Sequence, residues 1–132
     1  MGRKGFKDLI VWQKAKDLAV AIYKLSGGGD LGRDFGLRDQ IRRSAVSIAG
    51  NLAEGDERDT DKEAVHSFYI AKGSLAELQS QILIAYEIGY LKKEVYENIS
   101  ADYSELGKVI GKLIKYRRGA MKAGNRQEAI GL

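Results

Sequence analysis

The sequence feature that most constrains this chain is the complete absence of proline from its 132 residues. Proline removes a backbone donor and clashes with the preceding turn, so it is the strongest breaker of helix interiors. The chain is instead rich in Ala, Leu, Lys and Glu, which favour helix. The sequence therefore predicts long helices, and its length fits one domain built around one core.

The chain also contains no cysteine, which excludes disulfides, thiolate metal sites and cysteine nucleophiles and is typical of a reducing cytosol. No apolar run approaches the roughly 18 to 20 residues that cross a bilayer, and the N-terminus lacks a signal-peptide pattern. We therefore expect a cytoplasmic protein without membrane contact.

Four segments carry apolar residues at alternating spacings of three and four, the period of one helical face. They run from about 8 to 25, 35 to 54, 60 to 88 and 92 to 118. Four amphipathic helices joined by short connections bury their stripes against one another in a bundle. The sequence predicts an all-α, antiparallel up-down four-helix bundle over residues 1–118, followed by a frayed C-terminal tail over 119–132.

Local signals mark where these helices begin and end. Asp34 is a predicted N-cap, and Thr60-Asp61-Lys62-Glu63 has the form of a capping box, in which side-chain oxygens satisfy free backbone N–H groups. Gly55 and Gly89 are expected to end the second and third helices. The run Gly27 to Gly29 predicts a flexible loop, because glycine loses the most backbone entropy on ordering.

The first segment is expected to bury one face, formed by Trp12, Ala15, Ala19 and Ile22 with Leu18 and Leu25 beside them. The second is rich in small residues, which allow a neighbouring helix to approach closely. We therefore expect the second helix to be central and tightly packed.

The third segment carries a second, mixed face opposite its main apolar stripe. It consists of Ile70, Ser74, Glu77, Gln81, Ile84 and Ile88. Apolar anchors among polar groups suit a contact between subunits. The alternative is that this helix is central and buried on several sides.

A polar stripe follows the second segment at helical spacing, formed by Arg43, Ser47, Asn51 and Glu54. A solvated face ordinarily uses Lys and Glu, whereas Asn51 and Glu54 suit hydrogen bonding at a buried or shared surface. Contact between helices or between subunits is the favoured explanation, and ligand contact is the alternative. Asn51 and Glu54 therefore join the predicted oligomer interface.

Positive charge accumulates toward the C-terminus, where the sequence after Gly107 contains seven cationic residues and one anionic residue. Such a bias attracts phosphates. The predicted nucleic-acid contacts are Arg42, Arg43, Lys115, Arg117 and Arg118. The alternative is that cations near the end of the last helix complement its dipole and keep the protein soluble.

Candidate catalytic chemistry is sparse because His66 is the only histidine. Glu63 and His66 form one Glu-x-x-His pair, whereas a carboxylate-bridged di-iron bundle needs two. No serine lies in a nucleophile elbow, and the glycine run lacks the Lys-Ser/Thr of a phosphate-binding loop. We therefore expect no enzyme activity, no metal site, no cofactor and no small-molecule substrate.

Three motifs in order resemble the bacterial four-helix-bundle family called S23 ribosomal proteins, or 23S rRNA intervening-sequence proteins. They are FKDLIVWQKAKDLA (6–19), FGLRDQIRRSAVSIAGNLAEG (35–55) and FYIAKGSLAELQSQI (68–82). One departure is Ala49-Gly50, where the family usually has Pro and Ser. The resemblance implies an up-down bundle that assembles into a homopentamer. A more distant similarity, to the accessory variability protein of diversity-generating retroelements, implies a basic pentamer that works with nucleic acid.

We therefore predict a non-enzymatic oligomeric bundle, most simply a homopentamer, that binds RNA or an RNA-associated protein. In such a ring the weak positive potential of each subunit is multiplied by avidity. The alternative is a structural or protein-adaptor bundle without nucleic-acid contact.

Overall fold

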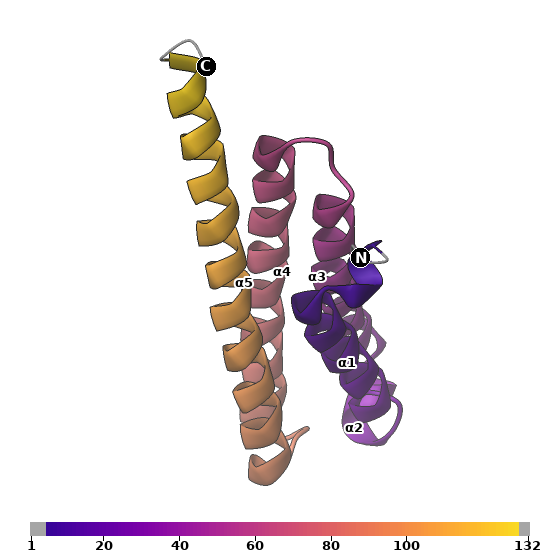
Figure 1. The fold of residues 1–132 in the computed structure, drawn as a ribbon. Helices are drawn as coiled ribbons and strands as arrows, with labels where there is room; N and C mark the ends of the chain where they lie inside the picture. The colour runs from indigo at the N-terminus through magenta and orange to yellow at the C-terminus, as the bar shows by residue number, and fades with distance from the viewer. Residues whose placement is uncertain (1–4, 130–132) are drawn as a thin grey trace.

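The computed structural model describes residues 5–129, with side chains described through residue 121 (Figure 1). A short 3-10 helix, η1 (Gly5–Asp8), precedes five α-helices. These are α1 (Ile10–Leu25), α2 (Gly29–Arg33), α3 (Phe35–Asp56), α4 (Asp61–Glu87) and α5 (Lys93–Ala129). The described chain has no strands, and α1, α3, α4 and α5 pack antiparallel, which confirms the predicted all-α bundle.

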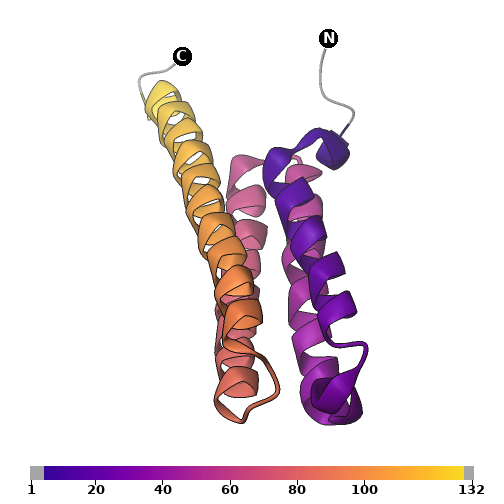
Figure 2. The same ribbon diagram turned by 90° about the horizontal axis from the view of Figure 1, so that it is seen from below.

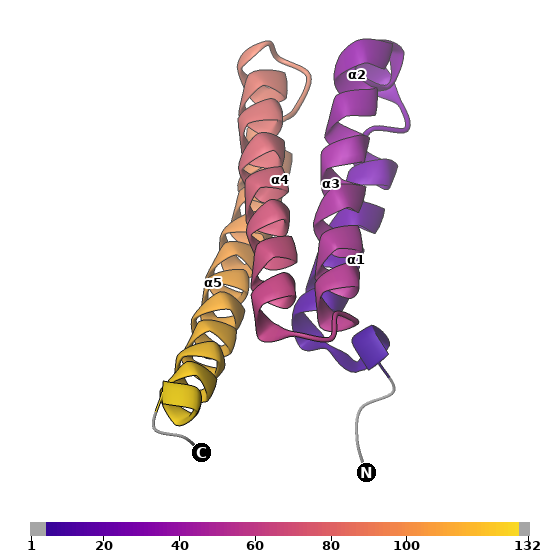
Figure 3. The same ribbon diagram turned by 90° about the horizontal axis from the view of Figure 1, so that it is seen from above.

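Helix α3 packs against both α1 and α4, and its contact with α4 is the most extensive one in the bundle. Helix α5 packs along α4, and a smaller contact between α1 and α5 closes the bundle. Figure 2 shows α1 beside α3 and α4 beside α5. Figure 3 shows that both ends of the chain leave at the same end of the bundle. No helix among the described residues is long and apolar enough to cross a membrane.

The core is a continuous apolar cluster to which all four main helices contribute. Fully buried side chains include Ile22 of α1, Ile48 of α3, Phe68 of α4 and Ile110 of α5. Burying each such side chain contributes about 1.5 to 3 kcal/mol, so packing outweighs intrinsic helix propensity in holding the bundle together.

The predicted helix starts are confirmed at both places where a cap was identified. The backbone N–H of Leu37 donates to Asp34 Oδ1 at 3.1 Å, and that of Glu63 donates to Thr60 Oγ1 at 3.2 Å. Gly89, with φ at +90°, follows α4 in the left-handed conformation that only glycine adopts cheaply.

Two predicted boundaries are wrong. Gly55 does not end the second helix, because α3 continues to Asp56 and Gly55 is buried against the Phe68 ring. The expected flexible loop after Gly27 contains the short helix α2, whose buried Leu31 joins the core. In both places the packing of the chain, and not its glycine content, determines where the helix lies.

The predicted face of α1 is confirmed at Ala15, Leu18 and Ile22, but it missed Val11. The buried side chains are Val11, Ala15, Leu18 and Ile22, whereas Trp12 and Ala19 are only half-buried. Trp12 and Ala19 instead line an open groove toward α3.

Helix α5 continues to Ala129, well past Gly119, where the sequence predicted a frayed tail. Ala120 and Met121 favour helix, and each glycine costs only about 1 kcal/mol relative to alanine. Figure 1 shows these last turns extending beyond the ends of the other helices. The part of the predicted tail from 130 to 132 lies outside the described residues.

Candidate nucleic-acid interface

Arg42, one of the five predicted basic contacts, is occupied inside the bundle. Its Nε donates to Ser26 Oγ at 2.8 Å and its Nη2 donates to the Tyr23 carbonyl at 3.1 Å. The guanidinium also lies over the Tyr23 ring, 4.5 Å from its centroid. These bonds satisfy the C-terminal end of α1, where carbonyls lack helical partners. Arg42 therefore holds α3 to α1, apart from the surface that Lys115 and Arg118 share.

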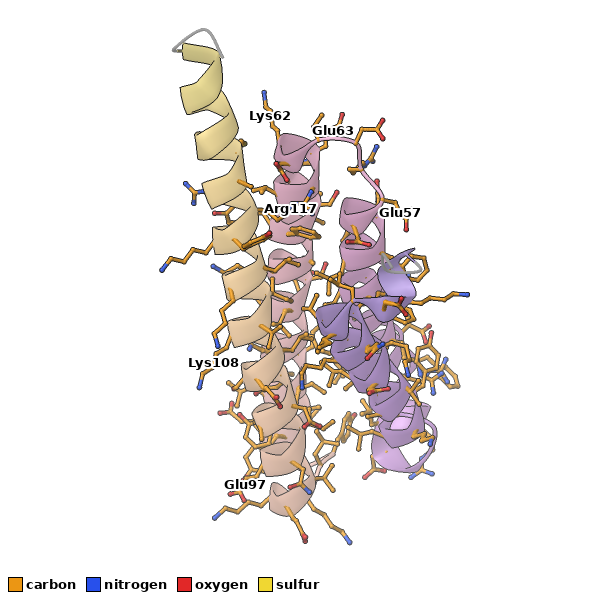
Figure 4. The ribbon with its side chains drawn as sticks, in the orientation of Figure 1. Glu57, Lys62, Glu63, Glu97, Lys108 and Arg117 are labelled. Carbon is orange, nitrogen blue, oxygen red and sulfur yellow. The ribbon has the colours of Figure 1, made fainter. Side chains whose placement is uncertain are left out.

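Arg117 is likewise committed to an internal contact. Its Nε donates to Asp61 Oδ1 at 2.6 Å, and the two side chains are 20% and 35% exposed. The guanidinium lies 5.9 Å from the centroid of Phe68. Figure 4 shows Arg117 directed from α5 toward α4, whereas Lys108 and Glu97 point outward. Arg117 therefore fastens α5 to the first turn of α4.

Lys115 and Arg118 line an open cleft between α4 and α5, which we call the basic cleft. Its volume is about 490 Å³, and it is lined by Tyr69, Lys72, Gly111, Ile114, Lys115, Arg118 and Gly119. Arg118 Nη1 donates to the Tyr69 hydroxyl at 2.9 Å. The cleft therefore gathers three cations and a tyrosine hydroxyl, with no carboxylate in its lining.

Two glycines and one isoleucine shape the basic cleft. A Cβ added at Gly111 or Gly119 would meet nothing within 4 Å, so both positions leave the floor of the cleft open. Ile114 is buried beneath them. Lys72 and Tyr69 were not predicted from the sequence. Their spacing of three on α4 puts them on one face, but the sequence does not indicate which face of α5 they meet.

Arg43 lies away from the basic cleft, on the other side of α4. It lines a polar pocket of about 410 Å³ together with Gln40, Ser44, Ser47, Ser74, Glu77 and Gln81. The structure thus joins the predicted polar stripe of α3 to the predicted mixed face of α4. It separates Arg43 from Lys115 and Arg118.

Most of the polar stripe is satisfied inside the chain. The hydroxyls of Ser47 and Ser74 form a hydrogen bond of 2.8 Å that links α3 to α4. Asn51 Nδ2 donates to the Ser47 carbonyl at 2.9 Å, and Glu54 pairs with Arg58. A contact between helices therefore accounts for Ser47, whereas Asn51 bonds within α3 and Glu54 pairs with Arg58 just beyond the end of that helix.

The mixed face of α4 stays open along its length. Ile70, Ile84 and Ile88 are 44%, 49% and 53% exposed, and Glu77 is also exposed. Ser74 is buried against α3. Gln81 Oε1 is buried and has no hydrogen-bond partner among the described residues. The alternative of a helix buried on several sides therefore does not hold for the isoleucines.

The shifted pKa values lie at structural contacts and not in the basic cleft. The pKa of Tyr90 is raised, chiefly because its hydroxyl donates to Asp34 Oδ2 at 3.0 Å. Burial raises the pKa of Tyr103. The pKa of Glu105 is lowered, first by its hydrogen bond from Lys14.

His66 is exposed beside Glu63 at the start of α4, with Arg58, Thr60 and Lys62 nearby. In the part of the chain that the structure describes, no three His, Asp or Glu side chains gather as a metal site. This region has the composition of a solvated helix start.

The sequence and the fold both match known proteins. Residues 7–112 match the family model described as 23S rRNA-intervening sequence protein. The fold is similar to a crystal structure from Bacteroides thetaiotaomicron VPI-5482, described as a protein with unknown function from the S23 ribosomal protein family. That structure is 27% identical in sequence with a TM-score of 0.73, and the match covers 80% of this chain and 98% of that one.

No curated protein matches the sequence. The family model spans most of the bundle, from η1 to about the middle of α5, and the solved structure shares its architecture. The chain therefore belongs to the 23S rRNA-intervening sequence protein family.

Proposed function

We propose that this protein is a non-enzymatic, oligomeric bundle that binds RNA through its basic cleft. The observation that carries the proposal is the convergence of Lys72, Lys115 and Arg118 on one open cleft without a carboxylate. Cations spaced along a groove neutralise successive phosphates and release their counterions. The family name, which refers to 23S rRNA, favours RNA over other polyanions.

Tyr69 gives the cleft a second means of holding a nucleic acid. Its side chain is partly exposed, and its hydroxyl accepts a hydrogen bond from Arg118. An aromatic ring beside cations is the arrangement that single-stranded nucleic acids use, because bases stack on the ring while phosphates meet the charges. We therefore propose single-stranded RNA, bound with little base selectivity.

Assembly would multiply this modest site. One subunit offers three cations, which gives weak binding at physiological salt, whereas several clefts on one assembly bind a single strand with avidity. The homopentamer expected from the family resemblance is the assembly we propose.

The test is fluorescence anisotropy with a labelled single-stranded RNA and the DNA of the same sequence. The double variant Lys72→Gln/Lys115→Gln removes two cleft cations, so the slope of log affinity against log salt falls by about 1.4. The matched control Lys92→Gln/Lys93→Gln removes two exposed charges outside the cleft and keeps the slope. If both double variants lost the same RNA affinity, or if binding did not depend on salt, the basic cleft would not be the RNA-binding site.

Tyr69→Ala separates stacking from charge, because it keeps all three cations. Loss of about 1 kcal/mol or more of binding free energy is expected if a base stacks there. An intact assembly that binds neither RNA nor DNA would instead support the protein-adaptor function.

A further inference from the structure

Two open apolar surfaces lie on either side of α3 and are not used by the basic cleft. The first, which we call the groove, runs between α1 and α3 with a volume of about 530 Å³. It is lined by Trp12, Lys16, Ala19, Val20, Tyr23, Lys24, Val46, Ala49 and Gly50. The second, which we call the ridge, is the line of Ile70, Ile84 and Ile88 along α4.

We propose that the groove of one copy of this chain receives the ridge of a second copy. This inference rests on the oligomeric state in the proposed function and names the surfaces that produce it. It does not depend on RNA binding.

The groove is shaped to accept side chains from outside the molecule. Val20, Tyr23 and Val46 are 47%, 45% and 48% exposed, although each is large and apolar. Glycine at position 50 costs about 1 kcal/mol of helix stability relative to alanine. A Cβ there would nevertheless meet nothing within 4 Å. Nothing inside the chain therefore requires glycine at this position, whereas an incoming side chain gains the space.

The ridge presents apolar side chains that match the groove. Ile84 and Ile88 lie one turn apart, and they are 49% and 53% exposed.

The charges of the two surfaces are complementary. Lys16 and Lys24 border the groove, and Glu77 and Glu87 flank the ridge on α4. Lys16 pairs with Asp17 at 2.7 Å, whereas Lys24, Glu77 and Glu87 make no ion pair with any described side chain. A lysine ammonium from the groove brings donors to these glutamates.

These charges also decide which surfaces meet. Ridge against ridge would oppose glutamates, and groove against groove would oppose lysines, so both symmetric pairings are repulsive. Pairing two different surfaces leaves one groove and one ridge free until the assembly closes on itself. Head-to-tail pairing of the groove with the ridge therefore excludes a two-fold dimer, and it gives a closed ring where the rotation between neighbouring subunits returns to the start.

The test uses one variant for each surface, with the mass of the assembly measured by light scattering after size-exclusion chromatography. Gly50→Lys fills the groove without an internal clash, and Ile84→Lys places a charge on the ridge. Each change buries a lysine against apolar surface, so the dissociation constant for self-association rises about a hundredfold or more. Circular dichroism checks that both variants remain helical.

Two controls match these variants. Leu83 is 41% exposed beside Ile84, but it points about 100° away around α4. Leu83→Lys is therefore expected to keep the mass of the wild type. Gly50→Ala adds one methyl group to the groove and is expected to weaken self-association less than Gly50→Lys does.

Mixing the two monomeric variants gives the decisive result. Gly50→Lys retains its ridge and Ile84→Lys retains its groove, so the mixture forms a species of two chains and stops there. A monomeric wild type, unchanged mass in either variant, equal loss in Leu83→Lys, or a mixture that stays monomeric would each overturn the proposal. Wild-type assembly without RNA binding would contradict the proposed function and leave this inference standing.

Discussion

The closest approach between two helices yields the sharpest prediction for stability. Gly55 of α3 lies against Phe68 of α4, and a Cβ at position 55 would lie 2.6 Å from Phe68 Cε1 and 3.1 Å from the Ala64 carbonyl oxygen. Phe68 is fully buried, so its ring has no free space into which to move. Gly55→Ala therefore overpacks the contact between α3 and α4.

The magnitude follows from two opposing terms. Overpacking a well-filled core costs about 1 to 3 kcal/mol, and the contact at 2.6 Å places this case toward the upper end. Replacing glycine by alanine inside a helix stabilises the helix by about 1 kcal/mol. Gly73→Ala is the matched control, because a Cβ at Gly73 of α4 would meet nothing within 4 Å.

The difference between the two variants isolates the overpacking term, since both gain the same helix propensity. We expect Gly55→Ala to be less stable than Gly73→Ala by about 2 to 3 kcal/mol. For a chain of this size the melting temperatures then differ by roughly 6 to 15 °C. Urea unfolding at one low protein concentration measures the difference without a contribution from assembly. Equal stability of the two variants would refute the close contact of α3 with α4.

Three further predictions concern caps, ion pairs and ionisation. Thr60→Ala leaves the Glu63 N–H without its acceptor and lowers the unfolding free energy by about 1 kcal/mol, whereas Thr60→Ser retains most of it in urea unfolding. Asp61→Asn leaves the half-buried Arg117 unpaired and costs about 1 kcal/mol after allowance for solvent, a loss that Asp61→Glu reduces. Because burial raises the folded-state pKa of Tyr103, the unfolded state ionises first and stability falls as pH rises above 10.0. Tyr103→Phe removes part of that fall in unfolding measured on either side of this pH, and an unchanged slope would show that Tyr103 does not cause it.

The sequence by itself determined where the main helices lie and how several of them begin or end. Asp34, Thr60 and Gly89 act on backbone groups a few residues away, so their roles are legible from local spacing. The same holds for the isoleucines of α4, because the helical period alone separates them from the core stripe. The helical period also places the polar stripe on one face of α3, but it does not indicate that Ser47 bonds Ser74.

Only the tertiary structure decided which of the predicted cations join one helix to another and which line an open cleft. Arg42 reaches the end of α1, and Arg117 reaches Asp61 across 56 residues, whereas Lys115 and Arg118 open onto Lys72. All of these are basic residues on amphipathic helices, and the helical period does not distinguish them. Their roles depend on the rotation and register of one helix against another, which are set by how core side chains such as Phe68 interlock.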